Sequence, residues 1–409
     1  MALRQVRSAG VDLFLICVVW SILIGTLLIL QAVGLDFGFN IWPIGEFRNW
    51  IKFLQDGHGF SALKLFWAVD NRNALSPWWY LAARPLIFTV PAAPLILHLL
   101  VGLFVGIAAY LMLVELTRAR SFALSVGILS ALFLPNLYLD EVNWNFVGAL
   151  GCTLISIWLF ALFCNDRQKS GCLAGSYLAW FVAISTYTIQ IGAMGAIFMI
   201  SLRERLTAVP LIRATAGALA DAVPYFALLV VYVLLWITTS APAVLPSAYH
   251  LEFSYQTLAK SALFGLWNEH YQIFWMWMVR AGPRLMAIVF GLATATILLL
   301  LYRLKPSDYP RSTMHSLGFA FLIGVCIATP TIGLETMSNI WTPGTRWPML
   351  MQFWSPFLFC IIVFALTSAV PDRFWWSVWK AVTAGGAAFV ILLGIGFQPY
   401  PGCARAGGA

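Results

Sequence analysis

Runs of about twenty apolar residues recur along this sequence, and they constrain the fold more than any motif does. Hydrophobic residues make up 61% of the 409 residues and charged residues only 10%, against roughly 25% charged in soluble domains. Because so few charges cannot cover a soluble globule, lipid must cover much of the surface. A span needs about 20 mainly apolar residues, and inside a bilayer it must be a helix that satisfies its own backbone. The runs lack the alternation of barrel strands. We therefore expect one all-α transmembrane domain over residues 1–409, a polytopic helical bundle.

Hydropathy predicts about 11 spans, at approximately 12–34, 92–115, 121–138, 146–164, 171–187, 189–202, 222–239, 285–302, 316–333, 348–367 and 381–397. Only a short polar break around Thr186, Thr188 and Gln190 separates the fifth span from the sixth. This region is either two spans or one bent helix with a re-entrant piece, and the second alternative moves the C-terminus to the other side. The first span is too long for a signal-peptide core and no small-residue cleavage site follows it, so we expect it to be retained.

The basic residues predict the orientation. If the N-terminus is cytoplasmic, most clusters that flank spans lie in short inner turns, as the positive-inside rule requires; Arg280 and Arg284 are exceptions. This rule accounts for the net charge of +8, so we expect a lipid bilayer as partner and no nucleic acid. A bacterial inner membrane is the natural location. Residues 36–91 and 240–284 then form two long extracytoplasmic loops, and both contain apolar residues at the spacing of interfacial helices.

Several function classes are excluded by missing motifs. No P-loop and no GxGxxG stands at a strand–helix junction, which excludes a pump or nucleotide-sugar enzyme with its own nucleotide-binding domain, and a dinucleotide oxidoreductase. The seven cysteines have no metal-ligand spacing. We expect no cofactor; a divalent metal is possible but nothing indicates one.

Polar residues gather at the predicted outer face. Asp140 and Glu141 form the densest acidic feature, and they either act on a substrate, as proton acceptor, metal ligand or sugar contact, or form a solvated turn. Arg84 and Arg346 either hold a phosphate or pyrophosphate through bidentate hydrogen bonds or anchor the chain at the interface. His270 lies in the second outer loop.

The order of these features resembles the GT-C membrane glycosyltransferases, in particular the polyprenyl- or dolichyl-phosphate-sugar-dependent O-mannosyltransferase-like branch. The run Ala83-Arg84-Pro85-Leu86-Ile87-Phe88, followed by Pro94 and His98, is similar to that branch's start of the second span. The run from Leu134-Pro135 through Asp140-Glu141-Val142-Asn143-Trp144 is similar to its acidic turn, with one residue inserted. The resemblance covers roughly residues 12–205.

The resemblance implies a transferase that moves a sugar from a polyprenyl-phosphate donor to a glycan, lipid or protein acceptor on the extracytoplasmic face. In such enzymes a carboxylate after the first span is the base, and basic residues hold the donor phosphate, whose stabilisation is the main electrostatic task. The candidates carried over as catalytic are Asp36, Glu46 and Asp140. Those carried over as substrate-binding are Asn40, Arg84, Glu141, His270 and Arg346.

One position departs from the family pattern. Asn40 stands where the family has an acidic residue, and a neutral amide offers no carboxylate to take a proton. Either Asp36 or Glu46 supplies the base, or the alignment shifts by a few residues, or the chain is a non-catalytic relative. Two other functions remain open. A flippase or transporter for a lipid-linked glycan is disfavoured because no inverted repeat is visible, whereas a non-enzymatic membrane subunit fits the Asn40 departure.

Overall fold

The described part of the protein is helical. The computed structural model describes residues 10–22, 25, 75–89, 93–132, 144–239, 291, 310–337, 347–367 and 372–395, and these contain helices and short turns without a strand. After an N-terminal helical segment, Gly10–Ile22, the elements are α4 (Ser76–Thr89), α5 (Ala93–Thr117), α6 (Arg120–Leu132), α7 (Trp144–Asn165), α8 (Ser170–Thr186), the 3-10 helix η3 (Thr188–Gly192), α9 (Ala193–Leu206), α10 (Leu211–Thr239), α14 (Pro310–Met337), α15 (Trp347–Thr367) and α16 (Asp372–Ile395). The expected all-α class is confirmed.

Three segments of these helices are long and apolar enough to cross a membrane. They are Leu99–Thr117 in α5, Trp144–Asn165 in α7 and Leu211–Leu235 in α10. Shorter apolar helices, such as Arg120–Leu132 and Ser170–Thr186, accompany them. The chain is thus built to associate with a membrane; the number of about 11 spans stays a prediction.

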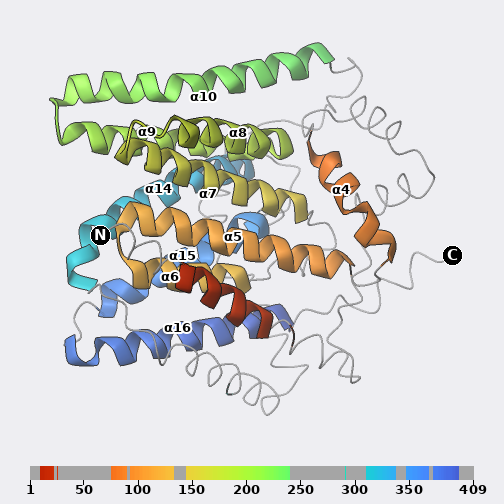
Figure 1. Cartoon of the computed structure of the whole chain (residues 1–409), viewed down its shortest axis with the longest axis vertical. Coiled ribbons are helices and arrows are strands. Elements are labelled where there is room, and N and C mark those ends of the chain that lie inside the picture. The colour runs from red at the N-terminus through yellow and green to blue at the C-terminus, as the bar shows by residue number, and fades with distance from the viewer. Residues whose placement is uncertain are drawn as a thin grey trace.

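The helices lie side by side in a bundle (Figure 1). α10 and α16 form its opposite edges, with α5 and α7 between them, and α4 lies at one end of the bundle. α6 packs against α5, α15 and α16, and every residue from Ser121 to Leu132 is buried. The core therefore runs through α5, α6 and α7.

Small residues allow a close helix contact between α5 and α6. A Cβ added to Gly106 would lie 2.5 Å from the carbonyl oxygen of Gly127 and 2.6 Å from the Cβ of Ala131. Membrane helices approach most closely where glycine and alanine face each other, because such small side chains let the two backbones come together. Gly106 and Gly127 are thus the positions at which the two backbones meet.

Buried polar groups hold the later helices to α6. Ser125 on α6 and Thr383 on α16 lie within hydrogen-bond distance, 2.9 Å between the hydroxyl oxygens, and the indole of Trp379 donates to Ser125 over 2.9 Å. The Gln352 amide on α15 donates to the carbonyl of Ser130 over 2.5 Å. Each pairing satisfies a polar group that would otherwise be costly in an apolar interior.

The chain reverses between α8 and α9. Tyr187 is extended, with φ −155° and ψ 110°, and η3 follows it. Arg167, just before α8, and Arg205, in the last turn of α9, both bond Asp221 on α10. Since the beginning of α8 and the end of α9 meet at the same carboxylate, the two helices are antiparallel. This arrangement matches two separate segments rather than one bent helix with a re-entrant piece.

The reversal packs against a proline in α14. A Cβ added to Gly192 would lie 2.2 Å from the carbonyl oxygen of Cys326 and 2.9 Å from the ring of Pro330. Proline has no N–H to donate to the carbonyl four residues earlier, which here is that of Cys326. Only glycine allows the backbone to come this close, so the break after α8 and the proline site of α14 fit together.

A buried carboxylate fixes the N-terminal helical segment. Asp12 is fully buried, and Arg120 on α6 donates to both of its oxygens over 2.5 Å. The Tyr110 hydroxyl on α5 donates to the same carboxylate over 2.7 Å. Three elements are thereby tied together at one end of the bundle, because burying this charge is tolerable only while it stays paired.

Candidate functional site

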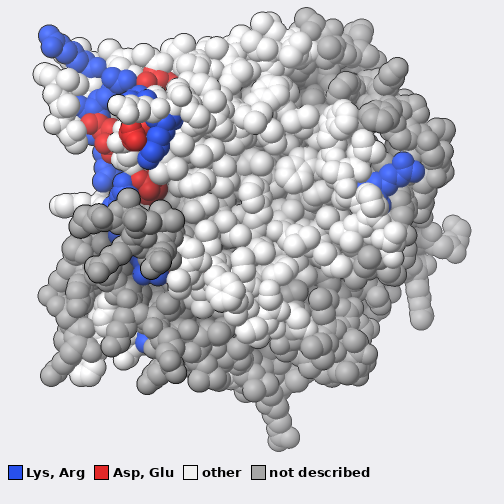
Figure 2. Space-filling view, in the orientation of Figure 1, with Lys and Arg blue, Asp and Glu red and all other residues white. Residues whose placement is uncertain are grey.

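The two ends of the bundle differ in chemistry. Figure 2 shows Lys, Arg, Asp and Glu gathered at the end where α9 and α10 join, and a largely uncharged surface between the ends. The opposite end, where α4 lies, is aromatic. The resemblance predicts the substrate site at the outer face, and α4 comes from the first predicted outer loop, so the aromatic end is the candidate site.

Two side-chain hydrogen bonds attach α4 to the bundle. The Trp79 indole donates to the Thr186 hydroxyl at the end of α8 over 3.0 Å. The Tyr80 hydroxyl donates to the amide oxygen of Asn145 in the first turn of α7, over 3.3 Å. The α4 helix thus lies across the ends of α7 and α8.

Trp144, the first residue of α7, is the centre of the aromatic cluster. Its ring makes edge-to-face contacts with Trp79, at 5.7 Å between centroids, and with Tyr80, at 5.5 Å. Gly148, one turn on, leaves room for Trp79, whose ring lies 2.7 Å from where a Cβ would stand. Edge-to-face pairs are favoured by the ring quadrupoles, so these aromatics form a fixed platform.

Two donors at this end of α7 and α8 are buried without a partner among the described residues. They are the Trp144 indole N–H and the Ser185 hydroxyl, in residues that are 3% and 1% exposed. An unpaired buried polar group costs about 1–3 kcal/mol, and each such case in a folded protein calls for an explanation. By contrast, the nearby Thr153 hydroxyl donates to Gln190 over 2.9 Å. Hydroxyl or phosphate oxygens of a bound molecule are one kind of partner that fits both donors.

Arg84 is the candidate residue that the structure describes. It lies on α4 one turn after Tyr80 and is partly buried. The other candidates, Asp36, Asn40, Glu46, Asp140, Glu141, His270 and Arg346, lie outside the described residues, as does all of the 240–284 loop and the 36–91 loop before residue 75. Their roles stay predictions.

The sequence did not single out the platform as a unit. Tryptophans near predicted span ends are typical of interfacial anchors, so Trp79 and Trp144 do not stand out in the sequence. The run Trp78-Trp79-Tyr80 is the signal available in the sequence, but its contact with Trp144 depends on the helix packing.

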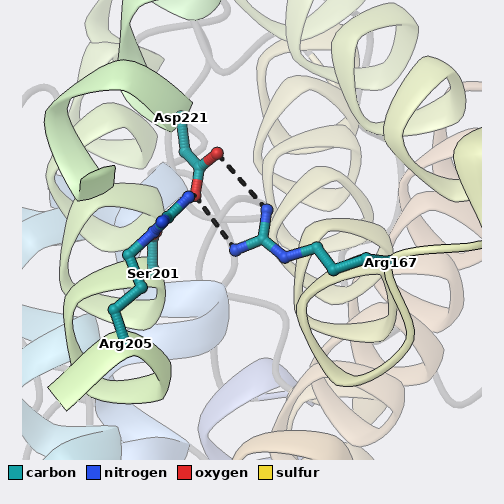
Figure 3. A network of polar contacts seen from close by, with 4 residues as sticks. All are labelled: Arg167, Ser201, Arg205 and Asp221. Atoms are coloured by element: carbon teal, nitrogen blue, oxygen red, sulfur yellow. Dashed lines mark hydrogen bonds and ion pairs between the residues drawn. The ribbon is translucent and has the colours of Figure 1, made fainter. Parts of the chain in front are cut away.

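The charged end holds a network around Asp221 (Figure 3). Arg167 donates to both carboxylate oxygens, over 3.3 and 3.1 Å, and Arg205 donates to Oδ2 over 2.8 Å. The Ser201 hydroxyl donates to the same oxygen over 2.5 Å. Burial lowers the pKa of the Arg167 guanidinium, but its hydrogen bonds to Asp221 outweigh this and raise the pKa overall. The network joins the end of α7, the end of α9 and the start of α10.

Neither end offers a metal centre in the part of the chain that the structure describes, since no three His, Cys, Asp or Glu side chains there converge. No protein-family model, curated protein or solved structure matches this chain.

Proposed function

We propose that this chain is a membrane glycosyltransferase that moves a sugar from a polyprenyl-phosphate donor to a cell-envelope glycan, lipid or protein acceptor. The observation that carries the proposal is the aromatic end of the bundle. There, Trp79, Tyr80 and Trp144 form a platform, two buried donors at the ends of α7 and α8 lack a partner among the described residues, and α4 carries Arg84 one turn after Tyr80. The partly exposed ring of Trp79, donors that can bond hydroxyl oxygens and a guanidinium are groups that suit a sugar phosphate on an isoprenoid chain.

The covalent connection supports placing the acidic pair at this end. Glu141 is three residues before Trp144, and Asp140 four. An extended chain spans at most about 3.6 Å per residue, so both carboxylates stay within roughly 15 Å of the platform. This limit on distance supports a proposed site that combines Arg84, the aromatic rings and these acids.

In the proposed reaction a carboxylate of Asp36, Glu46 or Asp140 takes the proton of the acceptor hydroxyl as the acceptor oxygen attacks the sugar's anomeric carbon. The bond from that carbon to the phosphate oxygen breaks, and the phosphate leaves with the electron pair on the polyprenyl carrier. Arg84 stabilises the charge that develops on the leaving phosphate; a preorganised donor of this kind is typically worth a factor of about 100–1,000 in rate.

The test is sugar transfer or release by the full chain, purified with native lipids, from a panel of polyprenyl-phosphate sugars. We expect turnover in the wild type, loss in at least one of Asp36→Asn, Glu46→Gln and Asp140→Asn, and a fall of about 100-fold in Arg84→Gln. The matched control is Arg118→Asn, which also removes one positive charge but lies in the α5–α6 turn at the charged end.

Equal turnover in the wild type and all four site variants would refute the proposed site. Absence of turnover with every donor, by protein whose thermal unfolding is normal, would refute the enzymatic function and favour a binding subunit.

A further inference from the structure

The start of α10 exposes apolar and basic side chains together. At about 1.5 Å per residue, its 29 residues measure on the order of 43 Å, longer than a hydrocarbon core of about 30 Å. The extra length of α10 lies at the charged end of the bundle, because residues 222–239 carry no charge whereas Arg213 and Asp221 precede them. Leu211 and Ile212 are 62% and 84% exposed there.

Three guanidinium groups follow successive turns of this part of α10. Arg213 belongs to the helix itself. One turn on, Arg205 lies over Gly217, with a guanidinium nitrogen 2.4 Å from where a Cβ would stand. A further turn on, Arg167 reaches Asp221 from the α7–α8 loop. Positions 213, 217 and 221 are neighbours on a helix surface, so the three groups form a row along it, which we call the arginine row.

The charges around the row are not balanced. Segments 166–169 and 203–221 contain five cations, Arg167, Lys169, Arg203, Arg205 and Arg213, and three carboxylates, Asp166, Glu204 and Asp221. Lys169 pairs with Asp166 at 3.6 Å, and the single carboxylate of Asp221 forms ion pairs with both Arg167 and Arg205. Arg213 is exposed and forms no ion pair with a residue in the described ranges. The row therefore keeps an excess of positive charge at its outermost position.

We propose that the arginine row binds the phosphate of an anionic phospholipid in the leaflet at the charged end. Arg213 makes the first contact, and the excess charge of Arg167 and Arg205 draws the headgroup along the helix. Arginine suits this task because its planar fork matches phosphate oxygens and sheds water more readily than an ammonium group does.

Exposed apolar side chains beside the row favour a lipid over a soluble phosphate. Ile212 flanks Arg213, and the same helix continues with exposed Leu219, Val223 and Phe226. Only 17% of the apolar stretch of α10 is buried in the bundle, compared with 61% in α5 and α7. A phospholipid can place its phosphate on Arg213 and its acyl chains along the exposed apolar side chains of α10. A free phosphate can bind only the arginine.

The test is lipid retention by the full chain, measured by native mass spectrometry after purification in an equimolar mixture of phosphatidylglycerol and phosphatidylcholine. We expect phosphatidylglycerol to be retained preferentially. Since a direct hydrogen bond to a charged group contributes about 1.5–3 kcal/mol, Arg213→Gln should reduce the preference about tenfold or more, and Arg213→Lys, which keeps the charge but loses the planar fork, should reduce it less. Arg118→Asn removes a charge at the same end outside the row and should leave the preference unchanged.

Equal retention of the two lipids by the wild type, or the same loss in Arg118→Asn as in Arg213→Gln, would overturn the proposal. Glycerol phosphate at millimolar concentration separates the sources: displacement of phosphatidylglycerol by it would show a site for soluble phosphates instead. None of these outcomes depends on transferase activity, so this proposal and the proposed function can fail independently.

Discussion

Asp12 is the clearest case of a single residue on which the bundle depends. It is fully buried and holds both Arg120 and Tyr110. Asp12→Asn keeps the shape but removes the buried negative charge with which Arg120 pairs, and breaking a buried pair in this way costs about 3 kcal/mol or more. We expect a large decrease in the thermal unfolding temperature of the purified protein.

Arg118→Asn is the control for that measurement. Arg118 forms an ion pair with Glu115 at 2.7 Å, and its own side chain is exposed to solvent. Exposed ion pairs contribute about 0–1 kcal/mol to the free energy of unfolding. Arg118 also has a φ of 56°, a conformation that asparagine tolerates. A change as large as that of Asp12→Asn would show that any charge lost at this end destabilises the protein.

Trp144 allows the unpartnered donor to be tested by itself. Trp144→Phe keeps an aromatic ring near Trp79 and Tyr80 but removes the buried N–H. The smaller ring leaves a cavity that lowers stability, but if the N–H serves a ligand the variant should also bind a polyprenyl-phosphate sugar about tenfold more weakly, as loss of one hydrogen bond of about 1.4 kcal/mol implies.

Trp79→Phe provides the comparison, because its indole donates to Thr186. Both variants lose the same ring volume, so Trp79→Phe should lose about 1 kcal/mol more stability than Trp144→Phe because it also loses a hydrogen bond. An unchanged affinity in Trp144→Phe would mean that its N–H has no ligand.

At the scale of elements, the close contact of α5 with α6 predicts that a larger side chain at Gly106 destabilises the protein. Gly106→Ala places a methyl group against the backbone of α6, which cannot move aside as a side chain can. We expect a loss of about 1–3 kcal/mol, the usual cost of overpacking, seen as a lower unfolding temperature.

Gly318→Ala in α14 is the matched substitution, because nothing lies within 4 Å of its added Cβ. Alanine is favoured over glycine inside a helix by about 1 kcal/mol, so this variant should be neutral or more stable. Equal effects of the two substitutions would contradict the close α5–α6 approach.

Sequence periodicity predicted most elements well and failed at particular boundaries. The predicted spans 146–164 and 348–367 nearly coincide with α7 and α15. For α10, the predicted span begins at 222, whereas the helix begins at Leu211, because Arg213 and Asp221 reduce hydropathy without breaking a helix rich in alanine. For α16, the predicted span begins at 381 and the helix at Asp372, since Arg373 and Lys380 have the same effect. Hydropathy locates the apolar part of a helix, and a helix can extend beyond it.

The candidate site was less predictable for a different reason. Arg84 was found because its type and position suggested phosphate binding. The platform of Trp79, Tyr80 and Trp144 needs contact between α4 and α7, which no local pattern contains. Pairing across the chain, such as Asp12 with Arg120, is likewise set by tertiary packing.

At the scale of the whole molecule, the direction of each helix predicts which loops share a side of the membrane. In a variant without native cysteines, a cysteine at exposed Gln168 or Ala208 should react with a membrane-impermeant thiol reagent from one side. A cysteine at exposed Thr89 or Ile191 should react from the other. Reaction of Ile191→Cys from the same side as Ala208→Cys would refute the antiparallel arrangement of α8 and α9.

The contact of Gly192 with α14 also affects how the protein is made. Residues 187–192 leave the ribosome long before Pro330, and at about 5–20 residues per second the delay is on the order of ten seconds. During that time the interrupted backbone after α8 lacks the helix against which it packs. We therefore expect the α8–η3–α9 segment to complete its packing only after α14 has been made.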